Sequence, residues 1–294
     1  MLALEWLDMK ICIAGQPKTG TTALYHQIRS AVPEAVGVFE PTYEQLARAQ
    51  EVTASTGRDL VIKVVLNEAS AHRHWLPLPS EQFDKGVLLQ RDPRDTLVSL
   101  LLFLPRSYLY SQPGALATFL DLVRRKEDNP AAIDFSDLID LFNRLVGRQV
   151  FTEFITRQHY GLGWRHTRPE FFLFRYEDLV AGRTAALSDY LGLALPSEFQ
   201  LAKNFSFVAR TKQAGSWRHW FTEHDVALWR SELTPFLAAM GYKDDWQLAD
   251  TPQIPAEHGS GDIEKIVADM RQRRPRWRAQ SALDQLSSWG KHHL

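Results

Sequence analysis

The chain contains little cysteine, little net charge and no long hydrophobic run. Its single cysteine, Cys12, excludes an intrachain disulfide framework and favours a reducing compartment. The formal net charge of −1 gives no electrostatic reason to expect nonspecific binding to nucleic acid. No segment approaches the roughly 18 consecutive apolar residues of a membrane span, and the acidic Glu5 and Asp8 are not typical of a signal peptide. We therefore expect a cytoplasmic protein that neither spans a membrane nor binds nucleic acid.

The sequence also lacks the patterns of an ATP-dependent or a metal-dependent enzyme. The loop Pro17-Lys18-Thr19-Gly20-Thr21-Thr22 does not have the Gly-Lys-Ser/Thr order of an ATP-binding loop. His72 and His74 stand two residues apart, but no further ligands surround them, so no metal is expected. An ATP- and Mg²⁺-dependent small-molecule kinase stays open as an alternative function. A noncatalytic nucleotide-binding protein of the same fold is the other alternative, because a fold alone does not fix a function.

A phosphate-binding pattern is present between a predicted strand and a predicted helix. The apolar run 11–15 predicts a buried strand, and residues 23–28 have a helical pattern. In such a turn, backbone N–H groups and the helix N-terminus converge and favour an anion. Lys18 adds a mobile cation, and three threonines add hydroxyl donors. We therefore predict a phosphate cradle at residues 17–22.

A second phosphate site is predicted after another buried strand. The apolar run 87–90 leads into Arg91, and Pro93 suits the first turn of a helix that Asp92 would cap. Ser99 follows about two turns along that helix. Arg91 and Ser99 are therefore candidates to hold one more phosphate group. ATP does not need this second site, whereas a nucleotide with both a 5′ and a 3′ phosphate group does.

These motifs resemble those of sulfotransferases that use 3′-phosphoadenosine 5′-phosphosulfate (PAPS). Residues 17–22 resemble the family's 5′-phosphosulfate loop, and Arg91 with Ser99 resembles its 3′-phosphate motif. The stretches 174–179 (Phe-Arg-Tyr-Glu-Asp-Leu) and 210–217 (Arg-Thr-Lys-Gln-Ala-Gly-Ser-Trp) also match, in the family's order. The resemblance implies transfer of a sulfuryl group from PAPS to a hydroxyl, less readily an amine, of an acceptor. The nucleotide product would be 3′-phosphoadenosine 5′-phosphate (PAP), and no metal would be needed.

The resemblance also assigns roles to single residues. Lys18 would stabilise the leaving phosphate oxygen. Arg210 would hold the 3′ phosphate, with Lys212 and Gly215 in the same loop. Tyr176 matches a position that contacts adenine. The family usually has its second basic residue directly after the arginine of this loop, whereas Lys212 stands one place farther along.

The general base is where the chain departs from the cytosolic small-molecule branch of the family. That branch carries a histidine two residues after a strand lysine, and here Val65 follows Lys63 at that spacing. Carbohydrate-type and several bacterial members instead use a glutamate after the first helix, and Glu40 stands in a similar Phe-Glu-Pro setting. We expect Glu40 to be the base in an apolar surround, with Glu68 and His72 as reserve candidates. Lys63 is a candidate second cation near the sulfuryl group.

Alternating strand and helix patterns predict the fold class. Strands are predicted at 10–14, 60–66, 86–90 and 170–175, with helical patterns between them. We expect an α/β protein with a three-layer, P-loop-like fold, in which helices flank a central, mostly parallel sheet. The expected organisation is one sulfotransferase domain over 1–250, which includes a helical substrate-side insertion at 105–168. A C-terminal loop and helical tail at 251–294 would pack on the same domain, and the acceptor would be a small molecule or a carbohydrate.

Overall fold

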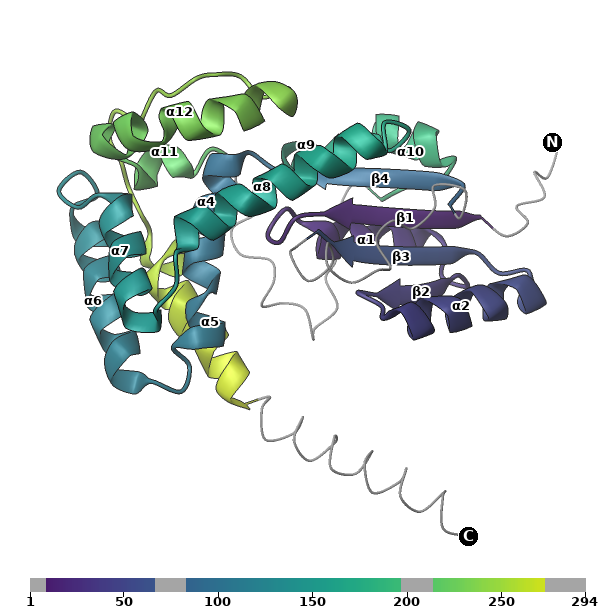
Figure 1. Cartoon of the computed structure of the whole chain (residues 1–294), viewed down its shortest axis with the longest axis horizontal. Coiled ribbons are helices and arrows are strands. Elements are labelled where there is room, and N and C mark those ends of the chain that lie inside the picture. The colour runs from purple at the N-terminus through teal and green to yellow at the C-terminus, as the bar shows by residue number, and fades with distance from the viewer. Residues whose placement is uncertain (1–8, 67–82, 197–213, 273–294) are drawn as a thin grey trace, which may run out of the picture. The chain divides into compact units, whose positions relative to one another are not determined.

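The structure is a computed structural model of the chain, and it describes residues 9–66, 83–196 and 214–272 (Figure 1). The chain forms two compact units, each assembled from segments that are distant in the sequence. Unit 1 comprises Met1–Val98, Phe151–Trp217 and Ala227–Gln247, and unit 2 comprises Ser99–Val150, Arg218–Val226 and Leu248–Leu294.

Unit 1 is built on a five-stranded sheet with the order β2-β3-β1-β4-β5. All four neighbouring strand pairs are parallel. Strands in such a sheet are covered on both faces, which explains why the central ones are nearly continuous apolar runs. The strands are β1 (Lys10–Gly15), β2 (Val36–Phe39), β3 (Leu60–Val65), β4 (Lys85–Gln90) and β5 (Phe172–Arg175).

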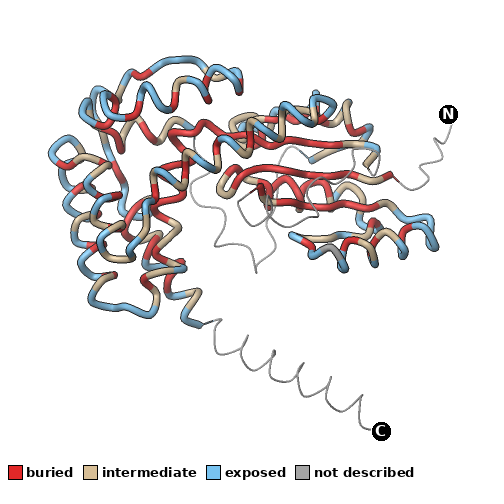
Figure 2. The backbone as a smooth tube through the Cα atoms, viewed as in Figure 1, coloured by how far each residue is buried: buried red, intermediate tan, exposed pale blue. Residues whose placement is uncertain are grey.

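Helices cover both faces of this sheet. Ile11 and Ile13 of β1 pack in a core with α1 (Thr21–Ala31), α9 (Tyr176–Val180) and α10 (Ala185–Leu191). Cys12 and Ala14 point to the opposite face, in a core with α2 (Tyr43–Thr56) and α8 (Val150–Thr167). Figure 2 shows the buried backbone concentrated in the central strands between these layers. The expected three-layer α/β fold is confirmed.

The four predicted strands are present with shifts of two residues or fewer at their ends, and the structure adds β2. This strand pairs with β3 at the edge of the sheet, with Phe39 opposite Lys63. Its four residues are half-buried or exposed, so they lack the buried apolar run that identifies the central strands. Gly37 lies so close to Tyr25 that a Cβ atom would come within 2.4 Å of its hydroxyl.

Unit 2 is helical in the part that the structure describes. Its helices α6 (Pro113–Asp128) and α7 (Phe135–Val146) pack Phe119 against Phe142, with ring centroids 5.6 Å apart. No helix in the described ranges is both long and apolar enough to cross a membrane. The expected insertion at 105–168 contains only helices, and its substrate-side role stays a prediction. The remaining elements are α4 (Pro93–Phe103), α5 (Pro105–Tyr108), α11 (Trp217–Trp220), α12 (Glu223–Ala239), η3 (Ala256–His258) and a helix over 260–272.

Candidate functional site

The carboxyl edge of the sheet gathers candidate residues from all five strands. In the order of the strands, Glu40 follows β2, Lys63 lies in β3, the loop 17–22 follows β1, Arg91 follows β4 and Tyr176 follows β5. Neighbouring strands are about 4.8 Å apart, so Arg91 begins one strand spacing from the loop and Glu40 two spacings away on the opposite side. Open parallel sheets bind ligands at this edge.

The loop after β1 has the geometry of an anion cradle. Gly20 adopts a left-handed conformation (φ 94°) and directly precedes α1. The first turn of α1 contains no acidic residue, so the positive end of the helix dipole faces the loop without a side-chain anion of its own. Thr19 is fully buried and donates its hydroxyl to the Gln16 carbonyl oxygen at 2.8 Å, which fixes the loop. The donors of this turn fit a phosphate group.

Arg91 joins the β1 loop to the end of β5. Its Nη1 donates to the Lys18 carbonyl oxygen at 3.2 Å, and its guanidinium carbon lies 4.3 Å from the centre of the Tyr176 ring. The same ring packs on Gly20, where a Cβ atom would come within 2.6 Å of it. Arg91 is 8% exposed. Lys18, Gly20, Arg91 and Tyr176 are therefore in one cluster, although three separate sequence motifs supply them.

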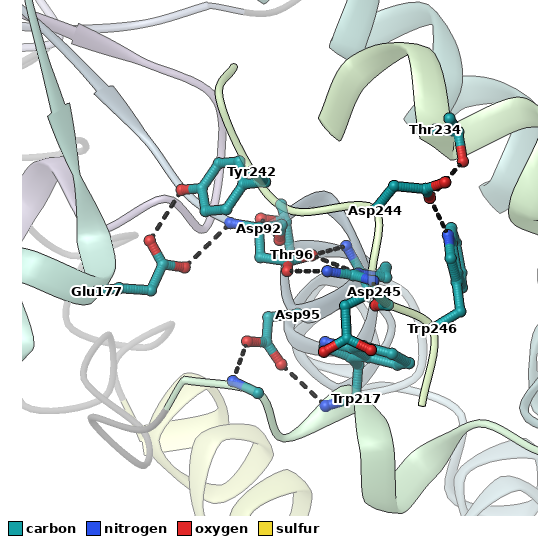
Figure 3. A network of polar contacts seen from close by, with 12 residues as sticks. Asp92, Asp95, Thr96, Glu177, Trp217, Thr234, Tyr242, Asp244, Asp245 and Trp246 are labelled. Carbon is teal, nitrogen blue, oxygen red and sulfur yellow. Dashed lines mark hydrogen bonds and ion pairs between the residues drawn. The ribbon is translucent and has the colours of Figure 1, made fainter. Parts of the chain in front are cut away.

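A network of buried and half-buried polar groups supports the turn between β4 and α4 (Figure 3), and Arg91 belongs to this turn. Asp92 accepts the N–H of Arg94 at 2.9 Å, which confirms it as the cap of α4, and it forms an ion pair with the Arg94 side chain at 2.7 Å. The Asp92 N–H donates to Glu177 at 3.1 Å, and the Tyr242 hydroxyl donates to the other Glu177 oxygen at 2.8 Å. Burial raises the pKa of Glu177, and these hydrogen bonds oppose the shift. Local sequence patterns do not identify Glu177 and Tyr242 as residues that support this turn, because only the fold brings them together there.

The residues assigned to the 3′ phosphate are only partly described. Arg210 and Lys212 lie outside the described residues. Gly215 is described, and its N–H donates to Asp95 at 2.6 Å. Ser99 is buried on α4 and belongs to unit 2, so its pairing with Arg91 stays a prediction.

Glu40 and Lys63 form an ion pair, in which Lys63 Nζ donates to Glu40 Oε1. The backbone also joins them, because the Glu40 N–H donates to the Lys63 carbonyl oxygen at 2.9 Å. The Lys63 side chain is 3% exposed and that of Glu40 is 48% exposed. Burial lowers the pKa of Lys63, and the neighbouring Glu40 carboxylate opposes this shift.

The apolar surround expected for Glu40 is wrong, because its carboxylate is half exposed and paired with a cation. Glu40 and Lys63 were both predicted as site candidates, but their pairing was not predicted. The reserve candidates Glu68 and His72, and also His74, lie outside the described residues. Within the described ranges, no group of three or more histidine, cysteine or acidic side chains is arranged to hold a metal ion.

A protein-family model and a solved structure are similar to this chain. The family model described as the sulfotransferase domain matches residues 8–238. Among solved structures, the chain is similar to mouse sulfotransferase SULT7A1 complexed with PAP, at 16% sequence identity and a TM-score of 0.48. That match covers 82% of this chain and 91% of the mouse chain. No curated protein sequence matches the chain.

Proposed function

The chain belongs to the sulfotransferase domain family, and from that premise we propose that it transfers the sulfuryl group of PAPS to an acceptor hydroxyl. Family membership supports sulfuryl transfer in general. The observation that supports the fuller proposal is the order of residues along the carboxyl edge of the sheet. Arg91 and Tyr176 lie on one side of the β1 loop, and Glu40 and Lys63 lie on the other. A donor nucleotide and an acceptor would thus approach the loop from opposite sides.

The nucleotide would lie over β1, β4 and β5. The N–H groups and hydroxyls of residues 17–22 would bind the 5′-phosphosulfate. Arg91, with Ser99 as the motif implies, would bind the 3′ phosphate, together with Arg210, Lys212 and Gly215. Tyr176 would contact adenine. We propose no metal, since a sulfuryl group has less charge to neutralise than a phosphoryl group.

The chemical step would be an in-line displacement. The acceptor oxygen forms a bond to sulfur while the bond from sulfur to the 5′-phosphate oxygen breaks, which releases PAP and the sulfated product. Lys18, helped by the hydroxyls of Thr21 and Thr22, neutralises the charge that develops on the leaving oxygen. Glu40 accepts the proton of the acceptor hydroxyl.

Lys63 would orient this base. One carboxylate oxygen of Glu40 is held by the buried ammonium group, and the Lys63 carbonyl oxygen holds the Glu40 N–H. Glu40 thus keeps a fixed position while half of its side chain remains exposed to an acceptor.

We propose a small-molecule or carbohydrate hydroxyl as the acceptor group. We also propose a cytoplasmic location, which the low cysteine content, Cys12 alone, supports.

Turnover with labelled PAPS and a panel of hydroxylated acceptors tests the proposal. We expect a labelled product, PAP formation in equal amount, and no requirement for Mg²⁺. Thermal shift should show stabilisation by PAP and none by ATP with Mg²⁺. Stabilisation by ATP with Mg²⁺ alone would favour the kinase alternative, and binding of PAP without turnover on any acceptor would favour the noncatalytic one.

A further inference from the structure

We propose that Asp95 is a positioning residue for the 3′-phosphate side of the nucleotide site, an inference that rests on the proposed function. Asp95 lies in the first turn of α4, four residues after Arg91. Its carboxylate holds residues 215–217, which are more than a hundred residues away in the sequence. The sequence motifs do not assign this positioning role to Asp95, because the helix dipole alone explains an aspartate in the first turn of a helix.

The contacts of Asp95 come from one short turn (Figure 3). Its carboxylate accepts the N–H of Gly215 at 2.6 Å, the hydroxyl of Ser216 at 2.8 Å and the N–H of Trp217 at 2.9 Å. The side chain of Asp95 is 0% exposed. A buried carboxylate is costly unless hydrogen bonds satisfy it, and these three donors provide such bonds. These hydrogen bonds also fix the position of residues 215–217 relative to Asp95.

The turn 215–217 is clamped by a second contact from the same helix. The Arg94 guanidinium carbon lies 4.1 Å from the centre of the Trp217 ring, and Arg94 is itself held by Asp92. One helix turn therefore fixes Arg91 on one side and residues 215–217 on the other. Arg91 and the segment that contains Gly215 are both assigned to the 3′ phosphate, and the hydrogen bonds to Asp95 fix the start of α4 and residues 215–217 relative to each other.

Two roles for the Asp95 charge predict opposite results. If Asp95 mainly competed with the phosphate for Arg91, removal of its charge would strengthen PAP binding. If it holds the turn, the same change weakens PAP binding, because an amide cannot accept from all three donors. The geometry favours the second role, since all three short hydrogen bonds go to the turn.

The test compares the affinities of PAP and adenosine 5′-phosphate, which lacks the 3′ phosphate. For Asp95→Asn we expect PAP affinity to fall about 10-fold or more, with adenosine 5′-phosphate changed by less than about 3-fold. The KM for PAPS should rise with kcat little changed, because the transferring group lies on the other side of the nucleotide. Ser216→Ala removes one of the three bonds and should give a smaller loss of the same selective kind. It keeps the test valid should Asp95→Asn fail to fold.

Asp225→Asn is the matched control, because Asp225 is equally buried and also accepts backbone N–H groups, from Phe135, Ser136 and Thr222, within unit 2. It should leave both nucleotide affinities unchanged in the folded protein. Equal losses for both nucleotides, or an unchanged or raised PAP affinity in folded Asp95→Asn and Ser216→Ala, would overturn the Asp95 assignment alone. A wild-type protein that binds both nucleotides equally would overturn the proposed function and the Asp95 assignment with it.

Discussion

Lys18 and Glu40 share an uncommon backbone conformation. They are the two non-glycine residues with positive φ in the described part of the chain, at 72° and 49°. Such a conformation costs on the order of 1–3 kcal/mol per residue and persists only where the surroundings impose it. At Lys18 the carbonyl oxygen is held by Arg91, and at Glu40 the N–H is held by Lys63. The two residues proposed for the chemistry are thus fixed by the residues proposed to assist them.

Lys18→Ala should reduce kcat about 100- to 1,000-fold, because it removes a cation that acts on charge developing in the transition state. PAP affinity should fall much less, since the loop N–H groups and Arg91 remain. Steady-state kinetics with PAPS, together with calorimetric titration of PAP, separates the two effects. A variant that keeps near wild-type kcat would show that the cradle is misassigned.

Glu40→Gln should nearly abolish turnover and leave PAP affinity close to that of the wild type. The amide is similar in size but cannot accept the proton of the acceptor hydroxyl. Glu51→Gln, at an exposed position of α2, is the control and should keep full activity. If Glu40→Gln transfers normally, the ion pair with Lys63 is structural, and Glu68 and His72 become the next residues to test.

The pairing of Glu40 with Lys63 illustrates what a sequence can and cannot predict about a site. The phosphate loop and Arg91 were predictable because each belongs to a local strand–turn–helix pattern. The ion pair depends on the register of two strands, which sets Phe39 opposite Lys63. No local sequence pattern indicates that register. The positive φ of Glu40 could not be predicted either, because the residue is not a glycine.

At the scale of elements, the same contrast separates the central strands from the edge. β1, β3 and β4 were predictable because both faces of each are buried, which demands a continuous apolar run. β2 is short and its residues are half-buried or exposed, and its Gly37 is required by the close approach of Tyr25 rather than by strand propensity. Its existence follows from pairing with β3, which is a tertiary property.

Two glycines of α8 should respond oppositely to replacement by alanine. A Cβ atom at Gly163 meets nothing within 4 Å, so Gly163→Ala should stabilise the helix by roughly 0.5–1 kcal/mol. A Cβ atom at Gly161 would come within 2.7 Å of the Gln16 side-chain nitrogen. That nitrogen donates to the Arg157 carbonyl oxygen, a bond that ties the phosphate loop to α8. Loss of such a bond costs on the order of 1 kcal/mol or more, which offsets the gain in helix propensity.

Denaturant unfolding of the two variants measures this difference, and PAPS kinetics follows its effect on the loop. We expect Gly163→Ala to be more stable than the wild type with an unchanged KM. Gly161→Ala should show no gain in stability and a raised KM for PAPS. Equal stabilisation by both substitutions would mean that the contact between Gln16 and α8 contributes nothing.

At the scale of the whole molecule, each unit contains buried charge of its own. In unit 1 the charges of Asp92, Arg94 and Asp95 lie at the start of α4. In unit 2, Lys126 of α6 is 0% exposed and donates to the carbonyl oxygens of Pro130 and Ile133. A charged group in such a place makes the free energy of unfolding depend on pH.

Burial lowers the pKa of Lys126 from 10.5 to about 8, and Asp225, Asp134 and Asp137 partly oppose the shift. Between these two pH values the unfolded chain holds a proton that the folded chain has released. The contribution of Lys126 to the free energy of unfolding should therefore rise as the pH increases from about 8 to 10.5, by roughly 2–3 kcal/mol. Below pH 8 both states hold the proton, so this contribution stays constant.

Cys12 acts in the opposite direction, because burial raises its pKa from 9.0 to about 12. The unfolded chain loses the thiol proton first, so stability falls with pH across that window, and the total for the wild type does not isolate Lys126. The variant Lys126→Met isolates the contribution of Lys126, because Cys12 contributes equally in the wild type and in the variant. The unfolding free energy of the wild type minus that of the variant should rise between pH 8 and 10.5. The carbonyl groups that lose their donor shift this difference by a constant and leave its slope intact. A flat difference would show that Lys126 stays charged in the folded protein.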